Sequence, residues 1–408
     1  MMELKVEVLK ADDGHRIVLL SQNGMPLYYP NLYITKQKRR SSYQTHLNIL
    51  HHIRILFFWC EVTGIEVEER FKRGDVLAAD EILNLVDFCA WDAETIKKIR
   101  SGVRLLKSAY REVSRSEASS RIGSIKEYLE FLFRNLARCS KKDPRLLSMS
   151  SDIKAYKPRV KSHRRIERVE LTQDQERILN EVVMPNHPEN PWPVDPGLRL
   201  RNLLMIYITL ETGMRRSELA ALRINDIDFV NRTVSVYRRH NDKLDPRTYQ
   251  PQAKSGERTI PISPELVEQI DNYVMHSRSK VPGAKKHPFL FVSHSPGGGG
   301  PLSVGTINHA FGQLSRAFPE LGRLHPHKFR HHWNYDYSRK VDEAFKGQPE
   351  EDKKAFDENT RAYLMGWKPG GTMSQTYNRR FDEEKAGELL EKRNEKYKIA
   401  IKDSDEPQ

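Results

Sequence analysis

The sequence predicts a mainly α-helical protein with a small antiparallel sheet (α+β), divided into two domains. Apolar residues recur at three-to-four spacing over several long segments, which is the pattern of amphipathic helices. Short alternating runs near the N-terminus and in the middle of the chain indicate strands. A chain of 408 residues is also too long for one ordinary core.

An N-terminal β-hairpin extension is expected over residues 1–35. Apolar and polar residues alternate around Asp12-Asp13-Gly14 and meet a second turn at Asn23-Gly24, which is typical hairpin chemistry. Acidic residues interrupt this alternation and no small-residue cleavage site follows, so the segment does not resemble a secretory signal. We therefore expect a cytoplasmic protein.

A compact helical module is predicted over residues 36–153. Helical spacing begins behind a start signal at Ser42 and Thr45, and it recurs near 79–90, 94–112 and 119–138. These segments predict four helices. Basic residues stand at the entrance of the module, where they form either a solvated loop or contacts with a polyanion: Lys36, Lys38, Arg39 and Arg40.

A basic linker is predicted at residues 154–168. Seven Lys or Arg residues fall within these fifteen positions, opposed only by Glu167, and there is no apolar period. Such a linker either lies along a phosphate backbone or serves only solubility. Its candidate contacts are Lys157, Arg159, Lys161, Arg164 and Arg165.

The charge balance favours a polyanionic partner. The formal net charge is +13 and the isoelectric point is near 9.4, although a surplus of lysine also suits ribosomal or membrane-surface proteins. No stretch approaches the roughly 18 apolar residues of a membrane span, so no membrane role is expected. Cys60, Cys89 and Cys139 lie far apart without zinc-site spacing, which favours buried reduced thiols over disulfides or a metal site.

A second domain is predicted over residues 169–395, with a flexible tail over 396–408. It opens with a capping box at Thr172 to Gln175, and a proline-rich loop leads to a strongly apolar helix near 199–212. Helices resume from Ser303, and a charged amphipathic helix is expected from Asp382 onward. Three strand-like runs between these helices predict the small antiparallel sheet: 226–229, 233–238 and 258–262.

The segment Glu211-Thr212-Gly213-Met214-Arg215-Arg216-Ser217-Glu218-Leu219 combines a helix end with an immediate helix start. Glycine permits the sharp reversal between the two helices. The new helix has free backbone N–H groups and a positive dipole end, so an arginine there can meet a phosphate in a favourable field. A plain helix-turn-helix with surface arginines is the alternative interpretation.

The segment Leu324-His325-Pro326-His327-Lys328-Phe329-Arg330-His331-His332-Trp333 holds four histidines and one arginine. A metal site is one interpretation, but the run contains no Asp, Glu or Cys. The simpler interpretation is that His327 and Arg330, three positions apart on one helical face, point into a shared site. No metal is therefore expected.

Taken together, these motifs resemble those of the tyrosine recombinases, the phage-integrase family. The first arginine motif of the family is matched by Thr-Gly, one apolar residue, Arg and then Glu-Leu. This match implies that Arg215, rather than Arg216, is the catalytic arginine. Pro-His-x-Phe-Arg-His, placed so that Arg330 stands 115 residues after Arg215, is similar to the second motif. Tyr363-Leu364-Met365-Gly366-Trp367 resembles the Leu-Gly-His box, and Tyr377, ten residues later, matches the nucleophile.

The resemblance also implies roles for three further residues. Glu218 is the acidic residue that orients the active-site side chains without contacting the substrate itself. Trp367 replaces the more usual histidine and can still donate an indole hydrogen bond to a phosphate, although it could equally be a core aromatic. Lys254, just before the strand at 258–262, matches the lysine of the family's β-hairpin, with Lys243 as the alternative.

These residue types suit phosphodiester chemistry. Two guanidiniums, Arg215 and Arg330, neutralise the non-bridging oxygens. A phenol with a pKa near 10 is only about 0.1% ionised at neutral pH, so Tyr377 needs His327 and the positive field. An ammonium at Lys254 can protonate the leaving 5′ oxygen. Because fixed cations stand where other nucleases use metal ions, and the phosphotyrosyl bond stores the energy for resealing, no cofactor is expected.

The resemblance implies a site-specific DNA recombinase that acts through a 3′-phosphotyrosine intermediate and a four-way junction. It implies a C-shaped clamp, built from a helical core-binding (SAM-like) domain and a catalytic domain. The expected partners are double-stranded DNA, further copies in a homotetramer on paired sites, and accessory DNA-bending factors, with the protein at the bacterial nucleoid when bound. A type IB topoisomerase and a non-catalytic DNA-binding protein are the alternatives.

Two features depart from the family pattern. The charged stretch from Glu343 to Asn359 is longer than the usual connection, and the N-terminal hairpin is too short for a typical arm-binding domain. Neither feature touches the expected catalytic residues.

Overall fold

The structure, a computed structural model, divides into two compact units at residues 1–163 and 164–408. It describes residues 3–103, 106, 109–160, 171–322, 324–368, 371, 386–387, 389–390 and 393. The boundary falls inside the segment predicted as a basic linker. The finer division into five parts and the clamp arrangement stay predictions, and each unit is described by itself.

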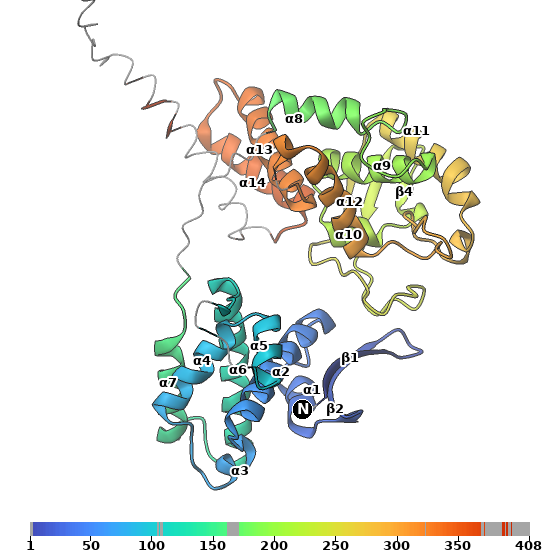
Figure 1. Ribbon diagram of the computed structural model, residues 1–408. Coiled ribbons are helices and arrows are strands. Elements are labelled where there is room, and N and C mark those ends of the chain that lie inside the picture. Colours follow the sequence, from blue (N-terminus) through green and yellow to red (C-terminus); the bar gives the residue numbers. More distant parts are fainter. Residues whose placement is uncertain are drawn as a thin grey trace, which may run out of the picture. The chain divides into compact units, whose positions relative to one another are not determined.

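The first unit opens with a three-stranded antiparallel sheet in the order β1-β2-β3 (Figure 1). β1 (Leu4–Lys10) pairs with β2 (Arg16–Gln22) along its whole length, and β3 (Met25–Pro26) adds a short edge. Asn23 and Gly24 both have positive φ, 51° and 81°, as a tight hairpin turn requires. The predicted hairpin with a following strand is therefore present.

Seven helices follow in the described part of the first unit, where the sequence predicts four. The long α2 begins as predicted, because the Ser42 hydroxyl accepts a hydrogen bond from the Thr45 N–H. The predicted helix at 94–112 is too long: it ends at Arg100, and Trp91 and Glu112 form a β-bridge instead. The helices are α1 (Tyr28–Gln37), α2 (Tyr43–Thr63), α3 (Val67–Lys72), α4 (Ala79–Ala90), α5 (Ala93–Arg100), α6 (Arg115–Leu136) and α7 (Pro144–Tyr156).

The core of the first unit lies between these helices and the sheet. Leu50, Ile53 and Trp59 of α2 are fully or almost fully buried, and the Trp59 indole donates to Asn84 at 2.8 Å. Leu20 on β2 is also fully buried, so the sheet shares this core. All three cysteines are free, but only Cys89 is buried as predicted, since Cys60 and Cys139 are partly exposed.

The second unit surrounds α9 (Pro196–Thr212), whose side chains are buried on nearly all sides. The predicted capping box at Thr172 and Gln175 is present and starts α8. The sheet has the predicted place but shorter strands. The elements are α8 (Gln173–Arg177), α10 (Arg216–Ala221), β4 (Ile227–Asp228), β5 (Thr233–Val236), β6 (Arg258–Pro261), α11 (Pro264–Asn272), α12 (Val304–Ala317), α13 (Pro326–Ala344) and α14 (Glu350–Met365), with short 3-10 and π turns between them.

The charged stretch at 343–359 becomes part of two packed helices. α13 ends at Ala344, a turn follows at Gly347 with φ of 84°, and α14 begins at Glu350. Lys353 on α14 bonds to Asp342 on α13 at 2.5 Å, which ties the two helices together.

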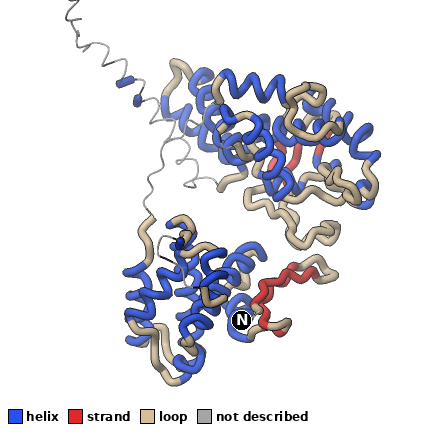
Figure 2. The backbone as a smooth tube through the Cα atoms, in the orientation of Figure 1, coloured by secondary structure: helices blue, strands red, loops and turns tan. Residues whose placement is uncertain are grey.

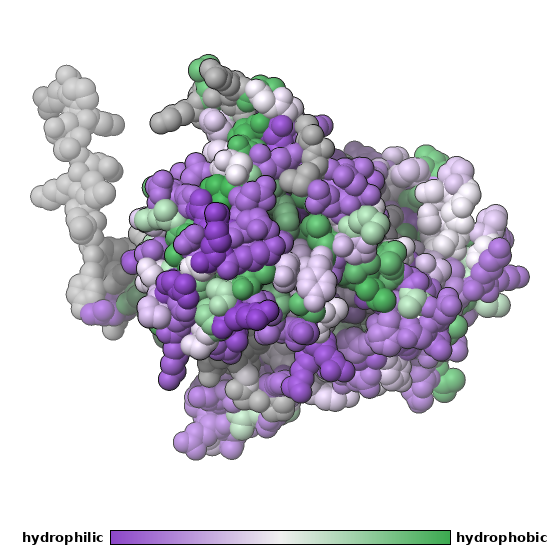
Figure 3. Space-filling view, turned by 90° about the horizontal axis from the view of Figure 1, so that it is seen from below, coloured by the Kyte–Doolittle hydropathy of each residue, from purple (hydrophilic) through white to green (hydrophobic). Residues whose placement is uncertain are grey.

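Helices dominate the tube drawing, and strands are confined to two small sheets (Figure 2). This confirms the predicted fold class of a mainly α protein with small antiparallel sheets. Figure 3 shows one face, on which hydrophilic residues predominate and hydrophobic ones are scattered. No helix in the described ranges has both the length and the apolar character needed to cross a bilayer.

Candidate active site

Four segments of the second unit are joined by hydrogen bonds, and two of them meet at the buried carboxylate of Glu218. They are the junction of α9 with α10, the loop that leads into β6, the first turns of α13 and the end of α14. Glu218 is 2% exposed, and its carboxylate accepts hydrogen bonds from the Ser255 hydroxyl and from the Arg258 guanidinium, the latter at 2.7 Å. One carboxylate therefore joins α10 to β6.

The electrostatics of Glu218 depend on its partners. Burial by itself raises the pKa of this carboxyl. The positive charge and hydrogen bond of Arg258 outweigh burial, with help from Ser255 and from the Arg215 N–H, and lower the pKa to about 2. Glu218 is therefore an anion at neutral pH, held among cations.

Arg215 lies at the N-terminus of α10 and remains accessible. Its N–H donates to Glu218 Oε2 at 3.0 Å, and its Nη1 lies 3.3 Å from Oε1, while 27% of the side chain is exposed. The preceding Gly213 ends α9 with φ of 60°. A Cβ at Gly213 would lie 2.8 Å from Met365 Cε, so glycine serves both the turn and the close packing there.

Arg330 on α13 joins the first arginine motif to the end of α14. Its guanidinium donates to the carbonyl oxygens of Gly213 at 2.7 Å and Met365 at 3.1 Å, and lies 5.7 Å from the Trp367 ring centroid. It is 1% exposed. The sequence did not predict this burial.

His327 is exposed on the first turn of α13, one turn before Arg330. Its ring lies 4.3 Å from that of His331, and the His325 side chain caps the helix by accepting from the Lys328 N–H at 3.1 Å. Within the described residues, no group of three or more His, Cys, Asp or Glu side chains is arranged to hold a metal ion.

Lys254 has an exposed side chain on a firmly held backbone. Arg238 donates to the Lys254 carbonyl at 2.9 Å and to the Ser255 carbonyl at 2.5 Å. Two residues further, the Gly256 N–H donates to the Gly366 carbonyl at 2.8 Å, which brings this loop beside the end of α14. The alternative, Lys243, lies on an earlier turn that Asp242 holds to Arg223.

The box at the end of α14 is shaped by Gly366. Its φ is 64°, and a Cβ there would lie 2.8 Å from both the Gly256 oxygen and Ser255 Cβ. The following Trp367 is partly buried, and its backbone N–H donates to the Ala362 carbonyl at 2.8 Å. Tyr377, the predicted nucleophile, lies outside the described residues.

The basic residues predicted to contact DNA lie in varied surroundings. Lys36, Arg39 and Arg40 are exposed, whereas Lys38 pairs with Glu127 at 2.6 Å. At the start of the linker, Arg159 is exposed and Lys157 is partly buried. Three others lie outside the described residues: Lys161, Arg164 and Arg165.

Sequence reasoning missed Arg258 and Arg238. Arg258 occupies an inward position on β6 and alternates with Ile260 and Ile262, all three of which are buried. An arginine at an inward strand position requires a buried acceptor, and this pattern was a signal for the pair with Glu218. No sequence signal marks Arg238, because its partners are backbone carbonyls 16 and 17 residues away.

The fold and the site define a helical protein in which two arginines, Arg215 and Arg258, pair with the buried carboxylate of Glu218. The model of the Phage integrase family matches residues 172–344. Over this range the chain is similar to this family, that of the tyrosine recombinases. The matched range includes Arg215, Lys254 and Arg330 and ends before the Trp367 box.

Two curated relatives are tyrosine recombinases. XerD of Halalkalibacterium halodurans is 27% identical over 223 residues, which cover 54% of this chain and 62% of the relative. XerC of Pediococcus pentosaceus is 27% identical over 145 residues, or 35% of this chain and 42% of the relative. The matches therefore span less than two thirds of these relatives.

Two solved structures are similar to this chain. One is the Tn1549 transposon integrase in complex with circular intermediate DNA, with a TM-score of 0.48 and a sequence identity of 17%. The similarity covers 86% of this chain and 95% of that one. A lambda integrase dimer bound to a core site has a TM-score of 0.46 and 15% identity over 86% and 75% of the two chains.

Proposed function

We propose that this protein is a site-specific DNA recombinase that breaks and rejoins DNA strands through a 3′-phosphotyrosine. The observation that carries the proposal is the meeting of the family's separate motifs around Glu218 and Arg258 in one unit. Similarity to curated relatives that are named tyrosine recombinases supports it.

In the proposed reaction, the Tyr377 oxygen attacks the phosphorus, and the bond from phosphorus to the 5′ oxygen breaks. The phenol proton passes to His327, and Lys254 gives a proton to the departing 5′ oxygen. Arg215 and Arg330 stabilise the charge on the non-bridging oxygens, and Trp367 donates a hydrogen bond. Attack by a second 5′ hydroxyl reverses these steps and reseals the strand.

The accessibilities of the side chains support this division of roles. Arg215 is partly exposed and Lys254 and His327 are exposed, so all three can reach a bound phosphate. Glu218 and Arg258 are buried and act by holding the others. Arg330 would change its partners from backbone carbonyls to phosphate oxygens when DNA binds.

The proposal includes double-stranded DNA as substrate, a homotetramer on paired sites that passes through a four-way junction, and accessory DNA-bending factors. It includes DNA contacts from the basic residues at the entrance of the helical module and from those of the linker. It places the protein in the cytoplasm, at the nucleoid when DNA is bound. It also includes catalysis without a metal ion or nucleotide.

A nicked suicide substrate that carries the genomic flanking DNA tests the proposal. The protein should form a denaturation-resistant DNA adduct that Tyr377→Phe abolishes. Tyr363→Phe is the matched control, since Tyr363 is 55% exposed and its hydroxyl bonds only weakly, at 3.4 Å, to the Thr259 carbonyl. An adduct in Tyr377→Phe, or its loss on chelation, contradicts the mechanism. Supercoil relaxation by a monomer, without synapsis, would favour a topoisomerase.

A further inference from the structure

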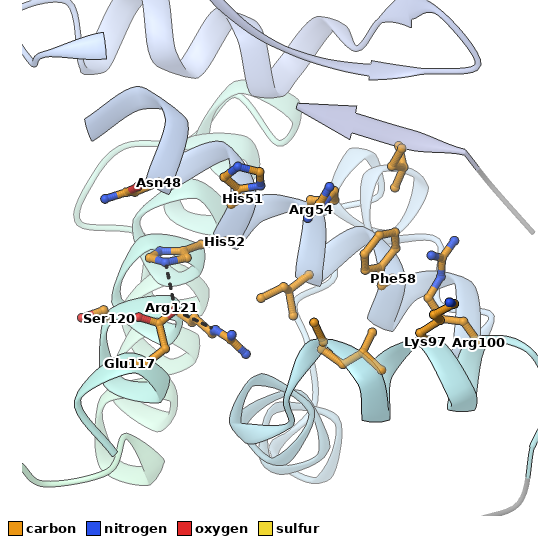
Figure 4. Close-up of a pocket in the computed structure, with 14 residues that line it drawn as sticks. Asn48, His51, His52, Arg54, Phe58, Lys97, Arg100, Glu117, Ser120 and Arg121 are labelled. Atoms are coloured by element: carbon orange, nitrogen blue, oxygen red, sulfur yellow. Dashed lines mark hydrogen bonds and ion pairs between the residues drawn. The ribbon is translucent and has the colours of Figure 1, made fainter. Parts of the chain in front are cut away.

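A pocket of about 680 Å³ opens in the first unit between β1, α2, α5 and α6 (Figure 4). None of the predicted DNA contacts lines it. Four cations, Arg54, Lys97, Arg100 and Arg121, line the pocket together with one carboxylate, that of Glu117. The lining therefore has a surplus of positive charge.

Two of these cations already have partners. Arg121 pairs with Glu117 at 3.0 Å and donates to the carbonyls of Cys89 and Trp91. Arg100 pairs with Glu61 at 2.7 Å. These two arginines are therefore held in place by the protein itself, and their charges are largely compensated.

Arg54 and Lys97 carry the uncompensated charge. The Arg54 Nε–H is buried and finds no hydrogen-bond acceptor among the described residues. A buried donor of a charged group without an acceptor is costly to the folded state, so this position favours a ligand that supplies one. Lys97 is exposed at the pocket and forms no ion pair within the described part of the chain.

Phe58 holds two guanidiniums close together. The Arg100 guanidinium carbon lies 3.7 Å from the Phe58 ring centroid, and that of Arg54 lies 5.6 Å from it. Burial lowers the pKa of Arg54, and repulsion from Arg100 lowers that pKa further. An anion bound beside them would offset this repulsion.

Neutral polar groups complete the lining. His51 stands one helical turn before Arg54, and Figure 4 shows both on the pocket side of α2, with Asn48 near them. Burial lowers the pKa of His51, as do the neighbouring Arg54 and His52, so its imidazole is neutral at neutral pH. His51 and Asn48 can each offer a hydrogen bond without adding charge.

We propose that this pocket binds a phosphate group, with Arg54 and Lys97 as its charged ligands. A carboxylate is satisfied by one guanidinium fork, whereas a tetrahedral phosphate accepts bonds from several directions at once. The donors here come from two helices, α2 and α5, which suits the tetrahedral anion. The phosphate belongs either to a DNA backbone, a source that rests on the proposed function, or to a free phosphate compound.

The test compares Arg54→Gln with Lys141→Gln in the full-length protein. Lys141→Gln removes the same charge from an exposed turn between α6 and α7. Affinity for duplex DNA is measured over a range of salt concentrations, where each lost phosphate contact lowers the slope of log K against log salt by about 0.9. The melting temperature is measured in parallel with and without inorganic phosphate or pyrophosphate.

We expect Arg54→Gln to lower the salt slope by about one contact while Lys141→Gln leaves it unchanged, which assigns the phosphate to DNA. If instead phosphate or pyrophosphate raises the melting temperature of the wild type but not of Arg54→Gln, the ligand is a free phosphate compound. Equal behaviour of the two variants in both measurements overturns the proposal. If the wild type does not bind duplex DNA, the proposed function fails, and the melting experiment still decides this inference.

Discussion

Arg238 acts on Lys254 through the backbone, since its guanidinium donates to the carbonyls of Lys254 and Ser255. Arg238→Ala should free this turn and displace the proposed general acid. We expect cleavage of ordinary DNA to fall by at least about 10-fold, a small part of what general acid catalysis contributes. A substrate with sulfur in place of the bridging 5′ oxygen should be cleaved at nearly the wild-type rate, because a thiolate leaves without protonation.

The cleavage rates of the two substrates distinguish a displaced Lys254 from a general loss of folded structure. Lys254→Ala should show the same selective rescue by the sulfur substrate, and it is the positive control. If Arg238→Ala slows both substrates equally, then Arg238 supports the fold and does not position Lys254.

The turn at the end of α14 controls how closely the Lys254 loop approaches Trp367. Gly366→Ala adds a Cβ that would lie 2.8 Å from the Gly256 oxygen at a φ of 64°. We expect a loss of unfolding free energy of about 1–3 kcal/mol, measured by denaturant titration, together with loss of the DNA adduct.

Gly347→Ala, in the turn that precedes α14, is the matched control. Gly347 also has positive φ, 84°, but a Cβ there meets nothing within 4 Å. Gly347→Ala should lower the free energy of unfolding by only about 1 kcal/mol, through backbone strain, and should leave adduct formation unchanged. Loss of the adduct in Gly347→Ala as well would show that helix-end strain, rather than the contact with Gly256, explains the effect.

At the scale of the whole molecule, the described residues form two separate hydrophobic cores. One includes Leu20, Leu50 and Trp59, and the other includes Met205, Leu219 and Phe311. Because each unit has its own core, fragments 1–163 and 164–408 should each fold when expressed alone. Circular dichroism should show a cooperative melt for each fragment. A fragment that is unfolded alone would mean that its stability depends on the other unit.

Part of the site could be predicted because its signals are local. Arg215, Lys254, His327, Arg330 and Trp367 stand in short motifs, and the structure brings their segments together in one unit. The predicted roles of these residues and of Tyr377 stay predictions. The burial of Arg330 could not be foreseen, since it depends on the carbonyls of Gly213 and Met365, which lie 117 and 35 residues away.

The sequence by itself determined the helix starts at Ser42 and Thr172, the turn at Asn23-Gly24 and the family motifs. Caps, turns and motifs involve neighbours within a few residues, so the local sequence specifies them. Only the tertiary structure decided that Arg258 neutralises Glu218, that Arg238 holds Lys254, and that a basic pocket forms beside Arg54. These contacts join residues far apart in the chain, and packing between elements alone brings them within hydrogen-bonding distance.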